Sequence, residues 1–524
     1  MRYTFYMKPG EYWWGGTAAR PECPLSESSP RYEHDFTLDC DNQTMPLYVS
    51  SMGRYIWSDH PFRAVAEKGV FALDGQDIGL YDAGSTLRDA YRAAQAARFP
   101  CDKVSMKDAF FKTAQYNTWM EFNYFPTQEG VLEYARRWLD SGYAPGIFII
   151  DEGWHKRYGE WRFDEARFPD PKGMIEALHE MGFVVLLWVV PFVSADGFHF
   201  THSRTEILSE NPETAKNLYM RNSSGGVALT EWWNGFSALL NLDNPTDARF
   251  LDAQLQRLME EYGVDGFKFD GGTPVIYSEK RIVNGPLRMS LSPHELNQAW
   301  NRFGRKYPFH EYKDTYKGGG INCIQRLRDK HHTWDDLGIR ALIPCAFTCG
   351  LIGHPFICPD MIGGGEWKFN YLPGFHVDEE LFVRMAQCSA LFPMMQFSWA
   401  PWRLLSDENQ RICRDMANLH ASLSNEILRL VRTAEITGEP ILRPLEYNDP
   451  GHGYAGITDE FMLGEDILSA PVVIKGQRRR TVVFPGGLWE DAEGNRYPGH
   501  TEQALDAPLE KLNWFRRVKL EARR

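Results

Sequence analysis

Residues 247–270, DARFLDAQLQRLMEEYGVDGFKFD, place a helix beside a strand and end on a carboxylate. The part before Gly263 is amphipathic and stops at a glycine, which is typical of a helix C-terminus. The part VDGFKF is a short apolar run, which is typical of a buried strand. Because two glycines follow Asp270, we expect the strand to open into a loop at this carboxylate.

The same alternation precedes this stretch. QEGVLEYARRWLDSG (residues 128–142) and PKGMIEALHEMG (171–182) are predicted helices, and GIFII (146–150) and FVVLLWVV (183–190) are predicted strands. Helices of about 12 to 16 residues between fully apolar strands indicate right-handed βαβ units and a parallel sheet covered on both faces. Continued over roughly 320 residues, the pattern favours a (β/α)₈ TIM barrel over an open doubly wound sheet, and no G-x-G-x-x-G follows a first strand.

Both ends of the chain lack this alternation of predicted helices and strands. Residues 1–108 are rich in Gly, Pro and Tyr with short alternating runs such as RYEHDFTLDC, so we expect a small N-terminal β-domain. After about residue 436 helical patterns stop and β-like runs return, as in FMLGEDILSAPVVIKGQRRRTVVFPGGLWED. The predicted order is therefore a β-domain (1–108), a catalytic barrel (109–435) and a C-terminal β-sandwich (436–524) in an α/β chain.

Composition narrows the class of function. The chain has 524 residues and a net charge of −13, which argues against nucleic acid or an anionic membrane surface as the partner. Its 17 Trp, 23 Tyr and 32 Phe are more than a core needs, and flat aromatic faces pack well on sugars. No apolar run has the length of a secretory signal or a membrane span, so we expect a cytoplasmic protein. The nine cysteines are scattered and are expected to be reduced core residues.

Carboxylates and tryptophans recur where the predicted barrel strands end. Asp151 and Glu152 follow one strand, Trp188 lies near the end of the next, and Asp270 ends a third with Lys268 on the same strand face. In such a barrel catalytic groups sit at these strand ends. Each acid alone is as readily a helix cap or a loop acceptor. Together, paired carboxylates with aromatic walls favour glycosidic bond hydrolysis.

Metal-assisted hydrolysis is the competing chemistry. His310, His331 and His332 are the best ligand candidates, but they do not have the spacing of a metal motif. We therefore predict no catalytic metal and no cofactor. A chelator should leave a glycosidase active and should inactivate a metal-dependent hydrolase.

Four stretches resemble glycoside hydrolase family 31, the retaining α-glycosidases, and the resemblance covers residues from about 110 to 480. They are IIDEGWHKRYGEWRFDEARFPDPKGMIEALHEMGFVVLLWVVPFVS, EWWNGFSALLNLDNP, GVDGFKFDGG and TWDDLGIRALIPCAFTCGLIGHPFICPDMIGG. The run W-x-F-D-x-x-R-F-P-D-P-K-x-M is highly specific to that family. KFDGG and PDMIGGGEW are more similar to the branch with the myogenesis-regulating glycosidase and bacterial α-galactosidases than to starch-type α-glucosidases.

The resemblance implies roles residue by residue. Asp270 matches the nucleophile, and Asp329, five residues before Trp334, matches the general acid/base. Asp151 matches the residue that grips sugar hydroxyls. The remaining positions that match the family's substrate-binding residues are Trp188 and Trp233 on the walls, Lys268 two residues before the nucleophile, and Asp360 on a later strand.

Lys268 has two readings. It can donate to a sugar hydroxyl and lower the pKa of Asp270, or it can serve only as an ion pair that holds Asp270 in place.

Two positions depart from the family pattern. Lys313 stands where the family has a sugar-binding Arg, which keeps the charge but loses the bidentate fork. Ser398 stands where the family has a His, and Gln396 and Trp399 are either its substitutes or ordinary loop residues. The residues at these positions therefore differ from those that bind sugar hydroxyls in the starch-type α-glucosidases. Trp13 and Trp14 are read equally as a pocket rim or as interdomain packing.

The leading hypothesis is a retaining exo-acting α-glycosidase, most plausibly an α-galactosidase. α-Glucosidase or α-xylosidase activity is the alternative within the class, and a non-catalytic glycan-binding protein is the alternative outside it. The expected partner is an oligosaccharide or glycoside, and a homo-oligomer stays open. A retaining mechanism predicts the Asp270 and Asp329 carboxyls about 5 to 5.5 Å apart. The linkage, the aglycone and the balance of hydrolysis and transglycosylation stay open.

Overall fold

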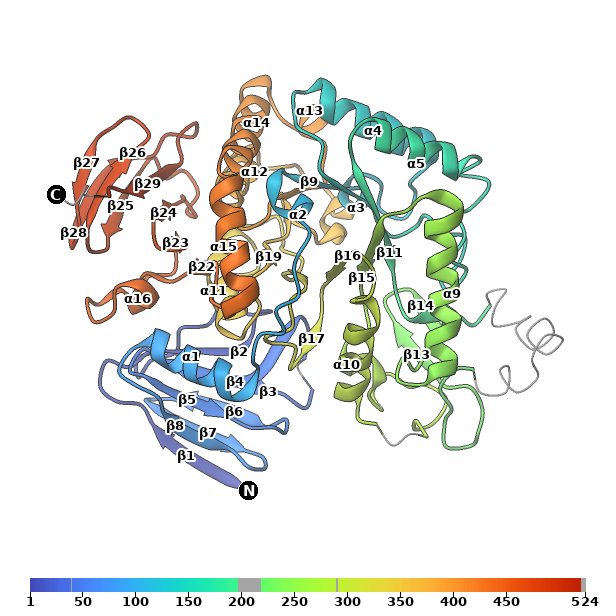
Figure 1. Ribbon diagram of the computed structural model, residues 1–524, viewed down its shortest axis with the longest axis horizontal. Helices are drawn as coiled ribbons and strands as arrows, with labels where there is room; N and C mark the ends of the chain where they lie inside the picture. Colours follow the sequence, from blue (N-terminus) through green and yellow to red (C-terminus); the bar gives the residue numbers. More distant parts are fainter. Residues whose placement is uncertain (39, 197–217, 289–290, 520–524) are drawn as a thin grey trace. The chain divides into compact units, whose positions relative to one another are not determined.

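The computed structural model describes residues 1–38, 40–196, 218–288 and 291–519 (Figure 1). These residues form two compact units. Unit 1 contains Met1–Thr37, Thr44–Ala114 and Gly318–Arg524, and unit 2 contains Leu38–Gln43 and Gln115–Lys317.

A parallel sheet forms the centre of unit 2. Its strands, in spatial order, are β9 (Gln115–Asn117), β10 (Ile147–Ile150), β11 (Val184–Val189), β15 (Gly266–Phe269) and β16 (Phe309–Tyr312). The three predicted strands are confirmed as β10, β11 and β15. Almost every residue of these three is buried, as expected for parallel strands that are covered on both faces.

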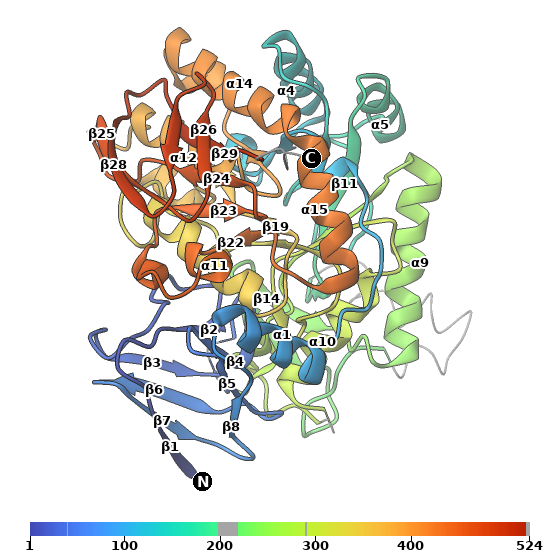
Figure 2. The same ribbon diagram turned by 60° about the vertical axis from the view of Figure 1, so that its left-hand side comes forward.

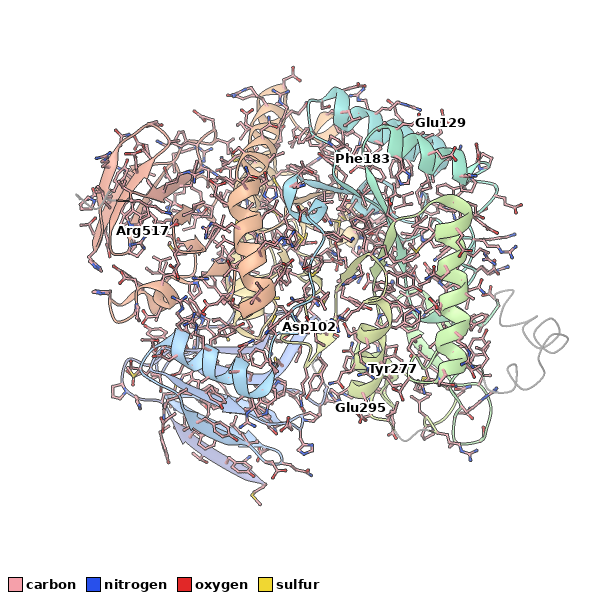
Figure 3. The ribbon with its side chains drawn as sticks, viewed as in Figure 1. Asp102, Glu129, Phe183, Tyr277, Glu295 and Arg517 are labelled. Atoms are coloured by element: carbon pink, nitrogen blue, oxygen red, sulfur yellow. The ribbon has the colours of Figure 1, made fainter. Side chains whose placement is uncertain are left out.

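Helices connect these strands and surround them in Figure 1. They are α3 (Trp119–Phe122), α4 (Gln128–Asp140), α5 (Pro171–Glu180), α9 (Pro245–Tyr262) and α10 (Pro293–Gly304), with a 3-10 turn η1 (Pro274–Tyr277). The predicted helices are confirmed as α4, α5 and α9. Figure 3 labels Glu129 and Glu295, which lie in the first turns of α4 and α10, where a negative charge complements the helix dipole.

A small antiparallel sheet follows the parallel strand β11 within unit 2. It consists of β12 (Phe192–Ser194), β14 (Gly235–Leu239) and β13 (Leu229–Trp232), in that spatial order. Unit 2 also contains the two-residue strand β17 (Thr315–Tyr316). The β13–β14 hairpin carries Trp232 and Trp233 at its turn.

The N-terminal part of unit 1 is largely β, as predicted. One antiparallel sheet has the order β1 (Arg2–Tyr6), β7 (Val70–Asp74), β6 (Arg63–Glu67), β3 (Tyr32–Asp35), and a second joins β2 (Trp13–Thr17), β4 (Gln43–Ser50), β5 (Arg54–Trp57) and β8 (Gly79–Asp82). Trp13 and Trp14 are fully buried, and Trp13 packs on Phe71 with ring centroids 5.5 Å apart. This contact lies within the N-terminal part of unit 1 and does not decide between a pocket rim and interdomain packing.

The β prediction for this region missed a helix, α1 (Leu87–Arg98), which is followed by the short α2 (Ala109–Lys112). Thr86 caps α1 by accepting from the Asp89 amide, and the Asp89 side chain accepts from the Thr86 amide in return. This reciprocal pair satisfies two amides that a helix start would otherwise leave without partners.

The middle of unit 1 contains two parallel strand pairs, β18 (Ile324–Arg326) with β19 (Ile357–Cys358) and β20 (Met361–Ile362) with β21 (Gln396–Phe397). Its helices are α11 (Leu342–Leu351), α12 (Glu379–Ser389), α13 (Pro401–Leu404), α14 (Asp407–Ser422) and α15 (Ser424–Thr437), with 3-10 turns η2 (Ile339–Ala341) and η3 (Trp367–Tyr371). Helix α11 is buried along its whole length, so it is a core element.

The C-terminal part of unit 1 is a β-sandwich, seen clearly in Figure 2. One sheet has the order β22 (Leu442–Arg443), β23 (Phe461–Leu463), β24 (Ile467–Ala470), β29 (Asn513–Arg517), β26 (Leu488–Asp491), β27 (Arg496–Pro498), and a ribbon pairs β25 (Arg479–Phe484) with β28 (Thr501–Asp506). Its core includes Leu468, Phe484, Trp489 and Phe515. The region also has short helical turns α16 (Leu445–Asn448) and η4 (Tyr454–Gly456), which the all-β prediction did not include.

Candidate active site

Asp270 lies at the carboxyl end of β15, where the barrel prediction placed it. Its backbone amide donates to the carbonyl of Val189 at 2.9 Å, which continues the sheet pairing to the last residue. Its Oδ2 accepts from Trp188 Nε1 at 2.9 Å, and its Oδ1 accepts from the Gly271 amide at 2.8 Å. Two donors from fixed elements therefore hold the carboxylate in one orientation.

Gly271 is required by its conformation and by its surroundings. Its φ of 63° lies in the left-handed region, and a Cβ there would come within 2.9 Å of the Phe192 ring. Any other residue here would therefore adopt an unfavourable backbone conformation, and its Cβ would clash with the Phe192 ring. The glycine after Asp270 keeps the loop close to the carboxylate.

Lys268 forms an ion pair with Asp151. Its Nζ lies 2.5 Å from Asp151 Oδ2, and both side chains are only 3% exposed. Asn117 Nδ2 donates to the same oxygen at 2.7 Å, and the Asp151 amide donates to Thr118 Oγ1 at 2.9 Å. The two sequence-based readings both paired Lys268 with Asp270 or with sugar. The structure instead gives Asp151 as its carboxylate partner, because β10 and β15 both flank β11 and their ends converge.

Two further carboxyls lie near Asp270: Glu152, which the sequence analysis placed at a strand end without assigning it a role, and Asp314, which it did not identify. Glu152 accepts from the Tyr158 hydroxyl at 2.7 Å and from Asn234 Nδ2, and it is 3% exposed. Burial, with the charges of Asp151 and Asp270, raises the pKa of Glu152 to about 8. Burial, again with the charge of Asp270, raises the pKa of Asp314 to about 8. At neutral pH both carboxyls therefore retain a proton.

The tryptophans predicted as walls have different environments. Trp188 is 1% exposed and contacts Asp270 through its indole N–H, so its role extends beyond a flat surface. Trp233 is 51% exposed and packs against buried Trp232 with ring centroids 4.8 Å apart. Trp233 is therefore an exposed aromatic face on the β13–β14 turn, next to the residue that donates to Glu152.

Asp329 and Asp360 share one arginine in unit 1. Arg326, the last residue of β18, places Nη1 at 2.8 Å from Asp329 Oδ1 and 3.2 Å from Asp360 Oδ1. Arg326 is 1% exposed, and sequence reasoning did not identify it. A guanidinium that binds two carboxylates can supply the directional donors that Lys313 lacks.

Asp360 is buried and strained. Its Oδ2 accepts from the Lys330 amide at 2.6 Å and from the Gly365 amide at 3.1 Å, and its φ is 142°, in the region that favours glycine. Burial and the neighbouring charge of Asp329 raise the pKa of Asp360. These hydrogen bonds join Asp360 to the backbone at Lys330 and Gly365.

Asp329 also lines a cavity of about 550 Å³ within unit 1. Charged side chains dominate its lining, including Arg20, Glu22, Arg328, Lys330 and Arg340. The side chain of Asp329 is 24% exposed, so the carboxyl is accessible from this cavity.

The two positions that depart from the family pattern lie in different settings. Lys313 follows β16, and its carbonyl accepts from the side-chain amides of Asn42 and Gln43 at 3.0 and 2.8 Å. Ser398 follows β21 and is fully buried, as are its neighbours Gln396 and Trp399. These placements do not test the roles in sugar binding.

The candidate metal histidines are held by backbone contacts. His332 Nδ1 bonds the Gly363 carbonyl at 2.7 Å and its Nε2 accepts from the Asp378 amide, and His310 Nδ1 bonds the Tyr307 carbonyl at 3.0 Å. Over the part of the chain that the structure describes, the convergent group of three possible ligands is instead Asp449, His452 and His500. Within the same ranges, no helix combines the length and the apolar composition needed to cross a bilayer.

Two family models match the chain. The glycosyl hydrolases family 31 TIM-barrel domain matches residues 109–428, and the glycosyl hydrolase family 31 C-terminal domain matches residues 438–518. Together with the parallel strands described above, these matches confirm the predicted (β/α)₈ TIM barrel with flanking β-domains.

Individual proteins are similar over most of this chain. The myogenesis-regulating glycosidase of Mus musculus is 32% identical over 411 residues, which are 76% of this chain and 55% of that protein. Alpha-glucosidase 2 of Bacillus thermoamyloliquefaciens is 24% identical, over 75% of this chain and 50% of that protein. The chain thus spans about half the length of these curated relatives. A family 31 dextranase structure from Flavobacterium johnsoniae, complexed with glucose, superposes with a TM-score of 0.81 at 18% identity, over 98% of this chain and 66% of that one.

Proposed function

From the premise that the chain belongs to glycoside hydrolase family 31, we propose that it is a retaining α-glycosidase that removes a terminal α-linked sugar. One observation carries the proposal. Asp270 is a strand-end carboxylate oriented by Trp188 and Gly271, and the buried carboxyls beside it either pair with Lys268 or retain a proton. Asp270 is therefore the carboxylate that we assign as the nucleophile, because its position and orientation are fixed at the strand end.

In the first step a carboxylate oxygen of Asp270 forms a bond to the anomeric carbon while the bond to the glycosidic oxygen breaks. The carboxylic acid of Asp329 gives its proton to that oxygen, and the aglycone leaves as an alcohol. In the second step Asp329 takes a proton from water, the water oxygen bonds to the anomeric carbon, and the ester to Asp270 breaks. Two inversions retain the α-configuration.

The remaining residues bind and orient in this proposal. The Asp151–Lys268 pair offers an acceptor and a donor to sugar hydroxyls, and Trp188 both positions Asp270 and walls the pocket. Arg326 positions Asp329 through the contact at 2.8 Å. The cavity lined by Asp329 would take the leaving group, because the proton donor must face the glycosidic oxygen.

For the sugar we propose galactose, on the similarity to the branch of the myogenesis-regulating glycosidase alone. α-Glucosidase activity is the second candidate, because a curated relative that aligns over three quarters of the chain is named an alpha-glucosidase. We propose exo action because a deep barrel pocket with tryptophan walls would enclose a single terminal sugar.

The test uses nitrophenyl α-galactoside, α-glucoside and α-xyloside with the native chain, Asp270→Gly and Asp329→Ala. We expect one sugar to be released by the native chain and both variants to be slowed severely. Added azide should rescue Asp270→Gly with a β-glycosyl azide as product, because azide takes the place of the missing nucleophile on the β face of the substrate. It should rescue Asp329→Ala with an α-glycosyl azide, because azide replaces water and attacks the α face of the glycosyl-enzyme. The control is Asp243→Asn, a carboxylate about half exposed in the same unit as Asp270, which should be as active as the native chain.

The anomer of the azide product and the presence of turnover distinguish the proposed mechanism from the alternatives. Rescue with the opposite anomers would reject the assigned roles of the two carboxyls. Binding of a glycan without turnover of any substrate, natural disaccharides included, would establish the non-catalytic glycan-binding alternative.

A further inference from the structure

Three side chains converge on one edge of the C-terminal β-sandwich. Asp449 follows α16, His452 lies in the next turn, and His500 lies between β27 and β28. Their potential ligand atoms all lie within 4.8 Å of one another, and the imidazole centroids of the two histidines are 4.2 Å apart. Residues separated by 48 positions in the sequence thus meet around one carboxylate.

The spacing is that of ligands around an ion. Asp449 Oδ1 lies 3.6 Å from His452 Nε2, and Asp449 Oδ2 lies 3.6 Å from His500 Nδ1. These separations are too long for hydrogen bonds. Ligands at about 2.0 to 2.1 Å from a tetrahedral ion are roughly 3.4 Å from each other, so small side-chain adjustments would complete a site.

Neighbouring groups already orient two of the three side chains. The Gly486 amide donates to Asp449 Oδ2 at 2.6 Å, and the hydroxyl of Tyr454 lies 3.2 Å from His500 Nδ1. Tyr454 belongs to the hydrophobic core of the sandwich, so its own position is fixed by packing. The Gly486 amide thus orients the carboxylate as outer partners do in known metal sites, whereas the Tyr454 hydroxyl would give up its contact with His500 Nδ1 when an ion binds that nitrogen.

The loop that carries Gly486 is itself fixed. Arg517, labelled in Figure 3, donates from Nη1 to the Gly486 carbonyl at 2.5 Å and stacks over Trp489 at 4.7 Å. A Cβ on Gly486 would come within 2.8 Å of His500 Nε2, so this glycine leaves room for the imidazole. His500 has a φ of 56°, which a residue with a side chain adopts infrequently, and its amide donates to the Phe484 carbonyl at 2.8 Å.

We infer that Asp449, His452 and His500 form a binding site for a divalent transition-metal ion of the zinc type. Two imidazoles and one carboxylate suit Zn²⁺, Ni²⁺ or Cu²⁺ and disfavour Ca²⁺ and Mg²⁺, which prefer oxygen ligands. Three protein ligands leave a coordination position for water. The ion would cross-link the turn after α16 to the turn between β27 and β28. This site at the edge of the sandwich is separate from the proposed glycosidase site.

The test is titration of the chelator-stripped full-length protein with Zn²⁺ by calorimetry and with Co²⁺ by visible absorption. We expect one equivalent at this site, with an intense Co²⁺ spectrum of four- or five-fold coordination. His452→Ala and His500→Ala should each weaken the affinity by about 100-fold. Both histidine side chains are 48% exposed, so their replacement should leave the fold intact, as circular dichroism will check.

The chain offers a matched control. His60 lies 3.7 Å from Asp77 and is about half exposed, but this pair has no second imidazole in the convergent group. His60→Ala should therefore bind Zn²⁺ like the native chain. Asp449→Asn retains an acceptor for the Gly486 amide and removes the charged ligand, so it should weaken binding at least tenfold. A native chain that binds no Zn²⁺ at submillimolar concentration would overturn the inference, as would His452→Ala or His500→Ala with native affinity.

Discussion

Replacing Glu152 by glutamine should change how the stability of the protein depends on pH. Glu152 is buried, and its pKa is raised from an ordinary 4.5 to about 8, first by burial and then by the charges of Asp151 and Asp270. Below pH 4.5 the carboxyl is protonated in both the folded and the unfolded chain. Between the two pKa values the unfolded chain loses the proton and the folded chain retains it, so the free energy of unfolding falls as the pH rises.

The magnitude follows from the two pKa values. Each pH unit between them corresponds to about 1.4 kcal/mol, so the native chain loses roughly 5 kcal/mol of stability through Glu152 between pH 4.5 and about 8. Above the folded-state pKa the loss is complete and the dependence ends. Glutamine has no such proton, and its carbonyl can still accept from Tyr158. The stability of Glu152→Gln minus that of the native chain should therefore rise by roughly that amount across this window.

The assay is urea unfolding followed by tryptophan fluorescence, at pH values from about 5 to about 8, for both chains. Glu129→Gln is the control for loss of a carboxyl, because Glu129 is exposed in the first turn of α4. Taking the difference between variant and native chain at each pH cancels the contributions of other groups. A difference that stays constant within about 0.5 kcal/mol over this range would refute the reasoning, since it would mean that Glu152 titrates alike in both states.

Three further predictions concern the proposed site. Trp188→Phe replaces the indole by a smaller aromatic ring without the N–H that donates to Asp270, so kcat/KM should fall by about 10- to 100-fold, and the unfolding midpoint measures how much the smaller buried ring also destabilises the fold. Arg326→Lys retains the charge and loses the planar guanidinium whose Nη1 donates to both Asp329 and Asp360, so kcat should fall by at least about tenfold, and a variant with native kcat would reject the positioning role. A chelator should leave turnover of the nitrophenyl glycoside unchanged, although it would strip the ion from Asp449, His452 and His500; lost turnover that added Zn²⁺ restores would contradict the metal-free mechanism.

Much of the barrel could be predicted from the sequence because its elements carry strong periodic signals. Helices α4, α5 and α9 are amphipathic, and β10, β11 and β15 are short apolar runs between them. Helix α1 was missed although a local signal existed: Thr86 stands three residues before Asp89, and the two cap the helix reciprocally. The Gly- and Tyr-rich strands around it dominated the interpretation of the whole region.

The site was only partly predictable, for physical reasons. That Asp151 and Asp270 lie at strand ends follows from barrel geometry. The partner of Lys268 does not, because it depends on the register of three strands and on the distance between side chains from β10 and β15. Arg326 ends a strand of three residues with no apolar run, so nothing in the local pattern marked it. The roles assigned to Asp270 and Asp329, and the expected cytoplasmic location, stay predictions.

A raised pKa alone does not distinguish a catalytic carboxyl from a structural one in this protein. Burial raises the pKa of Asp247 to about 7, yet its two oxygens accept from the backbone amides of Tyr219 and Asn241, which is a structural task. Burial likewise raises the pKa of Glu460 to about 8 although it pairs with Arg480 at 2.7 Å.

Glu152 and Asp360 differ from these structural carboxyls in position. Glu152 follows a strand end, next to the paired Asp151, and its partners are side chains. Asp360 follows β19, and its φ of 142° lies in a region that favours glycine, so this residue combines burial with backbone strain. Burial and backbone strain each lower stability, and their coincidence at strand ends is typical of functional sites. Asp360→Asn should therefore reduce turnover more than it reduces stability, which parallel kinetic and unfolding measurements can decide.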